Sequence, residues 1–389
     1  MKHIILEAMN TEAVVFDVGK LAAHLGQLPD SRDRRGKIYP LGVILTLVIL
    51  AKLAGEDKMS GIAEWIRLRR DAFVTLFNLQ HRRMPCLNII RWVLQEVVVA
   101  EELEEALQRY LHEAYGGQES RLIAIDGKTM RGTVPRGSSQ GVHLLAAYLP
   151  DEGIVLKQVM VEAKENEIVA APELVAGLDL KNKVVCGDAL HTQRALSANI
   201  LAGGGHYIWL VKNNQPALLT DVAQFFQPPQ KSAGWPLPPL THTVAQTTEK
   251  NHGRLTKRVL TLVADSQAFL DWPGVRQVIR LERHVSCPLT GRQTLDVVYA
   301  ITSCSPAQAS ADQLLAWIRN YWGIENSLHY RRDVTLREDA MRIGQPSLAR
   351  AVAGINNLLI GLSRKLGYTN LASARRRFSA QIAAQLHAV

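Results

Sequence analysis

Cysteine is scarce in this chain of 389 residues, which has four: Cys86, Cys186, Cys287 and Cys304. No two of them form a CxxC pair, and none stands beside histidines at the spacing of a zinc site. Cys186 lies in an apolar, strand-like run, where a buried reduced thiol is the ordinary expectation. The cysteine pattern therefore argues against a disulfide framework and favours a reducing cytoplasm.

Long hydrophobic runs are also missing. The most apolar segment, LGVILTLVILAKLAG at residues 41–55, is interrupted by Lys52 and is too short to cross a bilayer, so a buried core helix is expected. The N-terminus lacks the basic region, apolar run and cleavage site of a secretory signal. We therefore expect a cytoplasmic protein with no membrane partner.

Acidic residues are outnumbered by basic ones. The chain has 45 Lys and Arg against 36 Asp and Glu, a formal net charge of +9, and its pI is about 9.4. Such an excess either keeps the surface soluble or attracts a polyanionic partner, most often nucleic acid. The apolar content of 47% is that of a soluble globular protein, and the length allows two or three domains.

The first part of the chain is predicted to be helical. Apolar residues recur at helical spacing over 40–54 and again over 87–110. Gly116 and Gly117 then interrupt the chain before the first clear strand. We therefore predict an N-terminal helical domain over residues 1–118.

Strand-like runs follow, and their order indicates a mixed sheet. Three consecutive runs precede a helix, a strand, a second helix and a further strand, at residues 121–126, 143–149, 153–162, 167–178, 183–189, 192–202 and 206–212. The first three strands can form an antiparallel meander, whereas the later ones alternate with crossover helices. This order predicts a ribonuclease H-like core within a mixed α/β protein.

The pattern changes after Phe226. A proline-rich stretch, QPPQKSAGWPLPPL at 227–240, reads as a linker, and strand-like runs then continue to about residue 302. Helices resume near Ala311. We therefore predict a catalytic domain over 119–389 that is interrupted by a β-rich insertion at about 228–303.

Three carboxylates stand in positions suited to divalent cations. Asp126 and Asp188 each end an apolar, β-branched run, and Glu325 lies in an amphipathic helical pattern with apolar neighbours. Taken singly, each has an ordinary alternative: an Asp-Gly turn, a helix N-cap and a solvated glutamate, respectively. Taken together in a basic protein, they suggest a two-metal site that acts on a phosphodiester backbone.

Six segments in order carry a resemblance to a known family. They are AIDGKTMRG, KENEIVAAPEL, VVCGDALHTQR, YIWLVKNNQPAL, HGRLTKR and IRNYWGIENSLHYRRDVTLREDAMR. The chain resembles, from about Pro29 to Leu366, the DDE transposases of the ISAs-type insertion sequences, the group of the H-repeat-associated proteins. The pattern departs at Tyr321 and Arg332, where related transposases often have an arginine four residues before the glutamate and a lysine seven residues after it. It also departs at MPCLNIIRWVLQ, where relatives usually have a more polar segment.

The resemblance implies an enzyme of DNA transposition. Asp126, Asp188 and Glu325 would bind two divalent ions, Mg²⁺ or Mn²⁺, in a ribonuclease H-like domain. The chemistry would be phosphodiester hydrolysis at the transposon ends, followed by attack of the freed 3′-hydroxyl on target DNA. The implied partners are double-stranded DNA and a second copy of the chain, as a homodimer on paired ends, in a bacterial cytoplasm and on the nucleoid when DNA is bound.

Several polar and basic residues near these motifs are candidates for DNA contact, since charge contacts supply most DNA affinity. Lys128 and Arg131 follow Asp126, and His191 follows Asp188. Surface charge and local hydrogen bonding are the ordinary alternatives. The full set is Lys128, Arg131, His191, Lys212, Asn214, His252, Arg254, Arg258, Arg319 and Arg332.

Three other functions compete with transposition. A DNA-binding protein descended from a transposase but catalytically silent fits the charge, although all three carboxylates are present. A metal-dependent nuclease without strand transfer fits the triad equally well. A small-molecule hydrolase leaves the basic charge unexplained.

Overall fold

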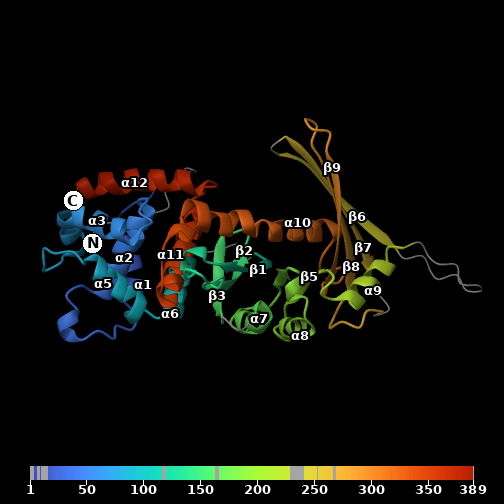
Figure 1. Ribbon diagram of the computed structural model, residues 1–389, viewed down its shortest axis with the longest axis horizontal. Coiled ribbons are helices and arrows are strands. Elements are labelled where there is room, and N and C mark those ends of the chain that lie inside the picture. The colour runs from blue at the N-terminus through green and yellow to red at the C-terminus, as the bar shows by residue number, and fades with distance from the viewer. Residues whose placement is uncertain are drawn as a thin grey trace, which may run out of the picture. The chain divides into compact units, whose positions relative to one another are not determined.

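The computed structural model describes residues 4–6, 9, 16–115, 120–162, 166–227, 241–251, 253–265 and 269–388. The chain is a mixed α/β protein with helices and a large sheet, and it divides into two compact units (Figure 1). Each unit is assembled from segments far apart in the sequence. The first comprises residues 1–119, 127–164 and 325–389, and the second comprises 120–126 and 165–324.

The first unit is mostly helical, as the sequence predicts for its N-terminal part. Its α-helices are α1 (Val18–Leu25), α2 (Leu41–Leu53), α3 (Met59–Leu68), α4 (Arg70–Phe77), α5 (Leu87–Trp92), α6 (Ala100–Tyr115), α11 (Pro346–Lys365) and α12 (Leu371–His387). Its short helical segments are η1 (Arg34–Gly36), η2 (Val93–Val97), η3 (Arg131–Thr133), η5 (Glu325–His329), η6 (Arg331–Thr335) and η7 (Glu338–Ala340).

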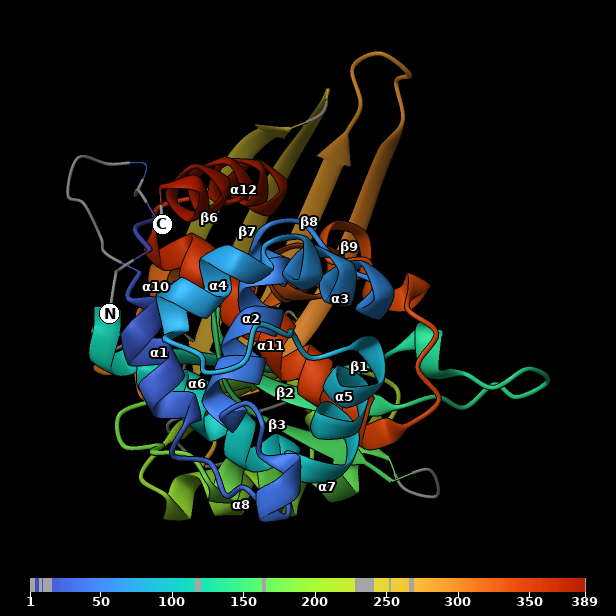
Figure 2. The same cartoon turned by 90° about the vertical axis from the view of Figure 1, so that its left-hand side faces the viewer.

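Helix α2 is the centre of the N-terminal helices. All thirteen of its residues are buried, including Lys52, which confirms the prediction of a buried core helix. Helix α1 packs beside it, as Figure 2 shows. Gly42 makes the close approach possible, because an added Cβ would lie 2.4 Å from the carbonyl oxygen of Ala22.

Helices α6 and α11 join the two ends of the chain within the first unit. They lie side by side in Figures 1 and 2, and α11 is buried from Leu348 to Ser363. Buried Arg350 of α11 donates to Glu104 of α6 and to the carbonyl oxygen of Gln158. The C-terminal helix is thus part of the same core as the N-terminal helices.

The strands of the first unit are those of the predicted meander. β2 (His143–Leu149) and β3 (Ile154–Val161) pair antiparallel, with His143 opposite Val161. The hydrogen-bonded order is β3-β2-β1, where β1 (Leu122–Thr129) runs through both units. The strands predicted at 143–149 and 153–162 are therefore confirmed, whereas β1 runs past the predicted end at Asp126 as far as Thr129.

The second unit contains parallel strands joined by helices. β1, β4 (Val184–Gly187) and β5 (His206–Val211) are parallel neighbours. Between and after them come α7 (Glu167–Ala176), η4 (Ala189–His191), α8 (Arg194–Ala202) and α9 (Pro216–Gln224). Strands β4 and β5 are buried along nearly their whole lengths, which explains why their sequences are continuous apolar runs.

Four long antiparallel strands extend this sheet. They are β6 (His242–Asn251), β7 (Arg254–Ala264), β8 (Gln277–Ser286) and β9 (Gln293–Thr302), and the order in this unit is β1-β4-β5-β9-β8-β7-β6. We call β6–β9 the arm; its strands are drawn in yellow and orange in Figure 1. The predicted strands of the insertion are therefore present, whereas most of the predicted linker at 227–240 lies outside the described residues.

Helix α10 (Ala311–Trp322) completes the second unit. A capping box fixes its start, because Ser310 accepts from the backbone of Gln313 and the Gln313 side chain accepts from the backbone of Ser310. No helix among the described residues is both long enough and apolar enough to span a membrane.

Candidate active site

Two of the three predicted carboxylates meet at one edge of the second unit's sheet. β1 and β4 are parallel, and Leu122 pairs with Val184 and Ala124 with Cys186. Asp126 and Asp188 each stand two residues beyond the last of these pairs, and the backbone of Asp188 is still extended (φ −72°, ψ −178°). Neighbouring strands lie about 4.8 Å apart, so the two side chains share one end of the sheet.

Asp188 is held by the turn that follows it. Its Oδ1 accepts from the backbone N–H of Leu190 at 2.9 Å, which caps η4. The Asn214 side chain donates to the carbonyl oxygen of Ala189, and Gln215 donates to that of Thr192. The predicted N-cap role of Asp188 is therefore real, but it uses only one of the two carboxylate oxygens.

A buried tyrosine lies close to the two aspartates. Tyr321, near the end of α10, has a raised pKa, first because it is buried and then because Asp126, Cys186, Asp188 and Glu167 lie nearby. Its neutral hydroxyl therefore stands among several acidic side chains. In the sequence, Tyr321 stands out only as a departure from the arginine of related transposases.

His191 is not at the surface. Its side chain is fully buried, and its Nε2 lies 3.1 Å from Oε2 of Glu167, the first residue of α7. The predicted contact of His191 with DNA is therefore corrected, because a buried imidazole against a carboxylate cannot reach a phosphate. Glu167 lies in the family-like segment KENEIVAAPEL, but nothing local in that segment predicts its partner.

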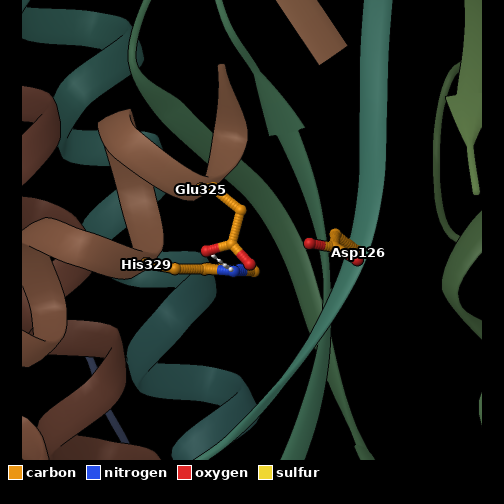
Figure 3. A group of neighbouring side chains, drawn as sticks. All are labelled: Asp126, Glu325 and His329. Carbon is orange, nitrogen blue, oxygen red and sulfur yellow. Dashed lines mark ion pairs between the residues drawn. The ribbon is translucent and has the colours of Figure 1, made fainter. Parts of the chain in front are cut away.

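Glu325 belongs to the first unit. It begins η5, a π-helical turn, and its side chain is 72% exposed, so the predicted apolar surroundings do not enclose it. Its Oε2 lies 3.5 Å from Nδ1 of buried His329, four residues later, as the dashed line in Figure 3 marks. His329 is not among the predicted site residues, although the E-x-x-x-H spacing puts both residues on one helical face.

The residues that follow Asp126 lie in the first unit and behave differently from each other. Lys128 is buried and makes an ion pair with Asp333, and its Nζ lies 4.0 Å from Asp339. Arg131 has a side chain that is 84% exposed and lies 3.9 Å from Asp339. Lys128 is therefore already neutralised by protein carboxylates, whereas Arg131 remains accessible.

Arg332 also requires a correction. Its side chain is 1% exposed and its guanidinium donates to both oxygens of Glu338, which is 0% exposed. Asn356 donates to the same carboxylate at 2.9 Å. Burial alone would raise the pKa of Glu338, but the charge and hydrogen bonds of Arg332 hold it below its usual value. Arg332 is therefore a core residue and not a DNA contact.

The remaining basic candidates lie in the second unit. Lys212 and Arg254 are exposed, while Arg258 is half-buried and donates to Glu249 at 3.1 Å. Arg319 of α10 is exposed and pairs with the same Glu249. The predicted candidate His252 lies outside the described residues.

Comparison with known families shows which family the chain belongs to. The family model of the transposase DDE domain matches residues 117–360. The chain belongs to the DDE transposase family. This transposase is accordingly an enzyme of insertion-sequence mobility and DNA recombination. Its residues 22–111 match the DDE_Tnp_1-associated family.

Individual relatives agree with the family. The transposase is similar to the "H repeat-associated putative transposase YhhI" of Escherichia coli strain K12, with 28% identity over 89% of this chain and 91% of that protein. It is similar to the "Putative transposase YncI" of Escherichia coli O157:H7, with 28% identity over 90% of this chain and 88% of that protein.

A solved structure is also similar, at a low level. The synaptic complex of piggyBac transposase with hairpin DNA aligns with a TM-score of 0.44 and 12% identity, over 95% of this chain and 79% of that chain. A TM-score of this size does not establish a shared fold.

Proposed function

We propose that this transposase hydrolyses a phosphodiester at each transposon end and then joins the freed 3′-hydroxyl to target DNA, with divalent cations bound by Asp126, Asp188 and Glu325. The observation that carries the proposal is the parallel register of β1 and β4, which brings Asp126 and Asp188 to one edge of the sheet. The family match, whose residues 117–360 include all three carboxylates, supports it.

The donor set suits Mg²⁺ or Mn²⁺. Both aspartates are half-buried carboxylates, and hard oxygen ligands are those that these ions prefer. Glu325 stands four residues after Tyr321 in the sequence, and the pKa of Tyr321 is raised first by burial and then by nearby charges that include those of both aspartates. Two bound cations would activate the attacking oxygen and stabilise the leaving oxygen.

The two steps balance without a covalent protein intermediate. In the first, water attacks phosphorus, the P–O3′ bond breaks, and a 3′-hydroxyl and a 5′-phosphate result. In the second, that 3′-hydroxyl attacks a target phosphorus, a new phosphodiester forms, and the target strand leaves with its own 3′-hydroxyl. The protein's part is to orient the carboxylates and the DNA, because no side chain becomes a nucleophile.

We further propose a ribonuclease H-like core over residues 119–389 interrupted by the arm, and a DNA-end-binding region within residues 1–118. The alternation of strands and crossover helices in the second unit supports the core. The exposed cations Arg131, Lys212, Arg254 and Arg319 are the best placed to contact phosphates. Paired ends would be held by two copies of the chain.

The test uses labelled transposon-end DNA, a target plasmid and Mg²⁺ or Mn²⁺. We expect metal-dependent cleavage and joining by the natural protein and neither by Asp188→Asn. The matched control is Asp312→Asn, the same substitution at an exposed aspartate of α10. Cleavage without joining would indicate a nuclease, and DNA binding that is identical in both proteins without any chemistry would indicate a silent DNA-binding protein.

A further inference from the structure

The turn that carries Asp188 rests on a buried pair that the transposition chemistry does not itself require. His191 is fully buried, three residues after Asp188 and at the end of the same turn, η4. Among the described residues, Glu167 is the acidic side chain at ion-pair distance from its imidazole, at 3.1 Å. Buried polar groups of this kind normally have a role, since burying them without a partner is costly.

Packing fixes the imidazole from the other side. A Cβ added at Gly187, the last residue of β4, would lie 3.0 Å from Cδ2 of His191, from Ile125 and from Trp209. The ring therefore fills the space directly beneath the strand end that leads into Asp188. Because Ile125 is the neighbour of Asp126, the same packed layer supports both aspartates.

Glu167 is itself held in place. Asn166 caps α7 by accepting from the backbone of Ile168, and a carboxylate in the first turn is favoured by the helix dipole. The Glu167 side chain is 17% exposed, and its charge reaches Tyr321 together with those of Asp126 and Asp188. Helix α7 thus presents the Glu167 carboxylate to the turn.

We propose that Glu167 and His191 form a positioning pair that fixes η4 and thereby the direction of the Asp188 carboxylate. This inference rests on the proposed function, because it assumes that Asp188 holds a cation. Glu167 acts through His191 and does not itself touch the ion. Outer residues of this type typically change metal affinity by about 10–100-fold when they are removed.

The test measures Mn²⁺ binding to the full chain by the loss of the free-ion electron paramagnetic resonance signal, with thermal unfolding beside it. We expect Glu167→Ala to weaken Mn²⁺ binding by about 10-fold or more. Glu167→Gln, whose amide oxygen can occupy the place of the carboxylate oxygen beside the imidazole, should stay within about 3-fold of the natural protein. Glu173→Ala, an exposed glutamate of the same helix, is the matched control and should bind Mn²⁺ normally.

A double-mutant cycle makes the pairing specific. His191→Leu should weaken Mn²⁺ binding as much as Glu167→Ala, and the double variant should be no weaker than either single one. Unchanged Mn²⁺ affinity in Glu167→Ala would overturn the inference, and so would additive losses. A Glu167→Gln loss equal to that of Glu167→Ala would also overturn it, because the charge would then act as a ligand.

Failure of the proposed function would look different. If Asp188→Ala binds Mn²⁺ as the natural protein does, Asp188 does not hold a cation, and both the proposed function and the positioning pair are rejected. If Asp188→Ala abolishes binding while Glu167→Ala leaves it intact, the proposed function stands and only the positioning pair is rejected.

Discussion

At the scale of single residues, burial decides what each charged side chain does. Arg332 and Arg131 both follow a proposed metal ligand in the sequence, yet one is 1% exposed and the other 84%. The buried guanidinium is committed to Glu338, whereas the exposed one is available to a phosphate. The same residue type therefore serves the core in one place and the surface in the other.

Arg332→Met should destabilise the protein strongly. It would leave the Glu338 carboxylate buried with the hydrogen bond from Asn356 but without its guanidinium, and breaking a buried ion pair typically costs about 3–5 kcal/mol. Urea unfolding would measure the loss. Exposed Arg342→Met is the control and should change the unfolding free energy by less than about 0.5 kcal/mol. A stable Arg332→Met with weakened DNA binding would instead restore its role as a DNA contact.

Lys52 offers a prediction about pH. It is fully buried, its Nζ lies 3.8 Å from Asp57, and burial lowers its pKa from 10.5 to about 8. Between pH 8 and 10.5 the unfolded chain binds this proton and the folded chain does not, so the stability of the natural protein rises with pH in that window. The rise is on the order of 3 kcal/mol for this shift.

Lys52→Met removes the buried ammonium, while Asp57 keeps its hydrogen bonds from Arg375. We expect the variant to be more stable than the natural protein at pH 7, and the advantage to shrink as pH rises from 8 toward 10.5. Thermal unfolding across this range, with exposed Lys58→Met as control, measures the difference. A difference that is constant with pH would contradict the assignment.

At the scale of elements, the arm is a sheet whose outer strand ends are exposed. The first residues of β7 and β9 are exposed, whereas the residues toward their other ends are largely buried. Arg254 and Lys257 of β7 lie at this outer end. An exposed strand end that carries cations is suited to contact with the DNA backbone.

Replacing both cations, Arg254→Ala with Lys257→Ala, should weaken DNA binding without harming the fold. For each phosphate that is no longer neutralised, the slope of log affinity against log salt should fall in magnitude by about 1. Fluorescence anisotropy at several salt concentrations measures that slope. Exposed Lys181→Ala, in the same unit, is the control. An unchanged slope in the double variant would remove the arm from the DNA interface.

At the scale of the whole molecule, the two units are built from discontinuous segments. The first unit needs the C-terminal helices, because Arg350 of α11 pairs with the buried Glu104 of α6. Burial raises the pKa of Glu104 to about 6 in spite of Arg350, so this carboxylate depends on its partner. Residues 1–118, the proposed DNA-end-binding region, are therefore not expected to fold independently of the rest of the chain.

The fragment 1–118 should accordingly fail to fold alone. Removing α11 exposes the buried face of α6, including Leu103, Leu107 and Leu111, and leaves Glu104 without Arg350. Circular dichroism and proteolysis of the fragment, beside the full chain, test this. A cooperative thermal transition in the fragment would show that the N-terminal helices have a core of their own.

The sequence by itself determined the local elements and the family to which the chain belongs. Apolar runs such as those of β2, β4 and β5, and the buried run of α2, are set by patterns a few residues long, which is why their predictions hold. The sequence also placed Asp188 correctly, directly after β4, whereas β1 continues past its predicted end at Asp126 as far as Thr129. The motifs around them were enough to place the chain in its family.

Only the tertiary structure decided which charges are available. Buried Arg332 has its partner in Glu338, to which Asn356 of a distant helix also donates, and buried His191 lies against Glu167 of α7. The exposure of Glu325 likewise depends on how η5 packs and not on its apolar neighbours in sequence. The sequence around a charged residue does not show whether the side chain is buried or paired. Its partner and its burial arise from contacts between segments that only the folded chain brings together.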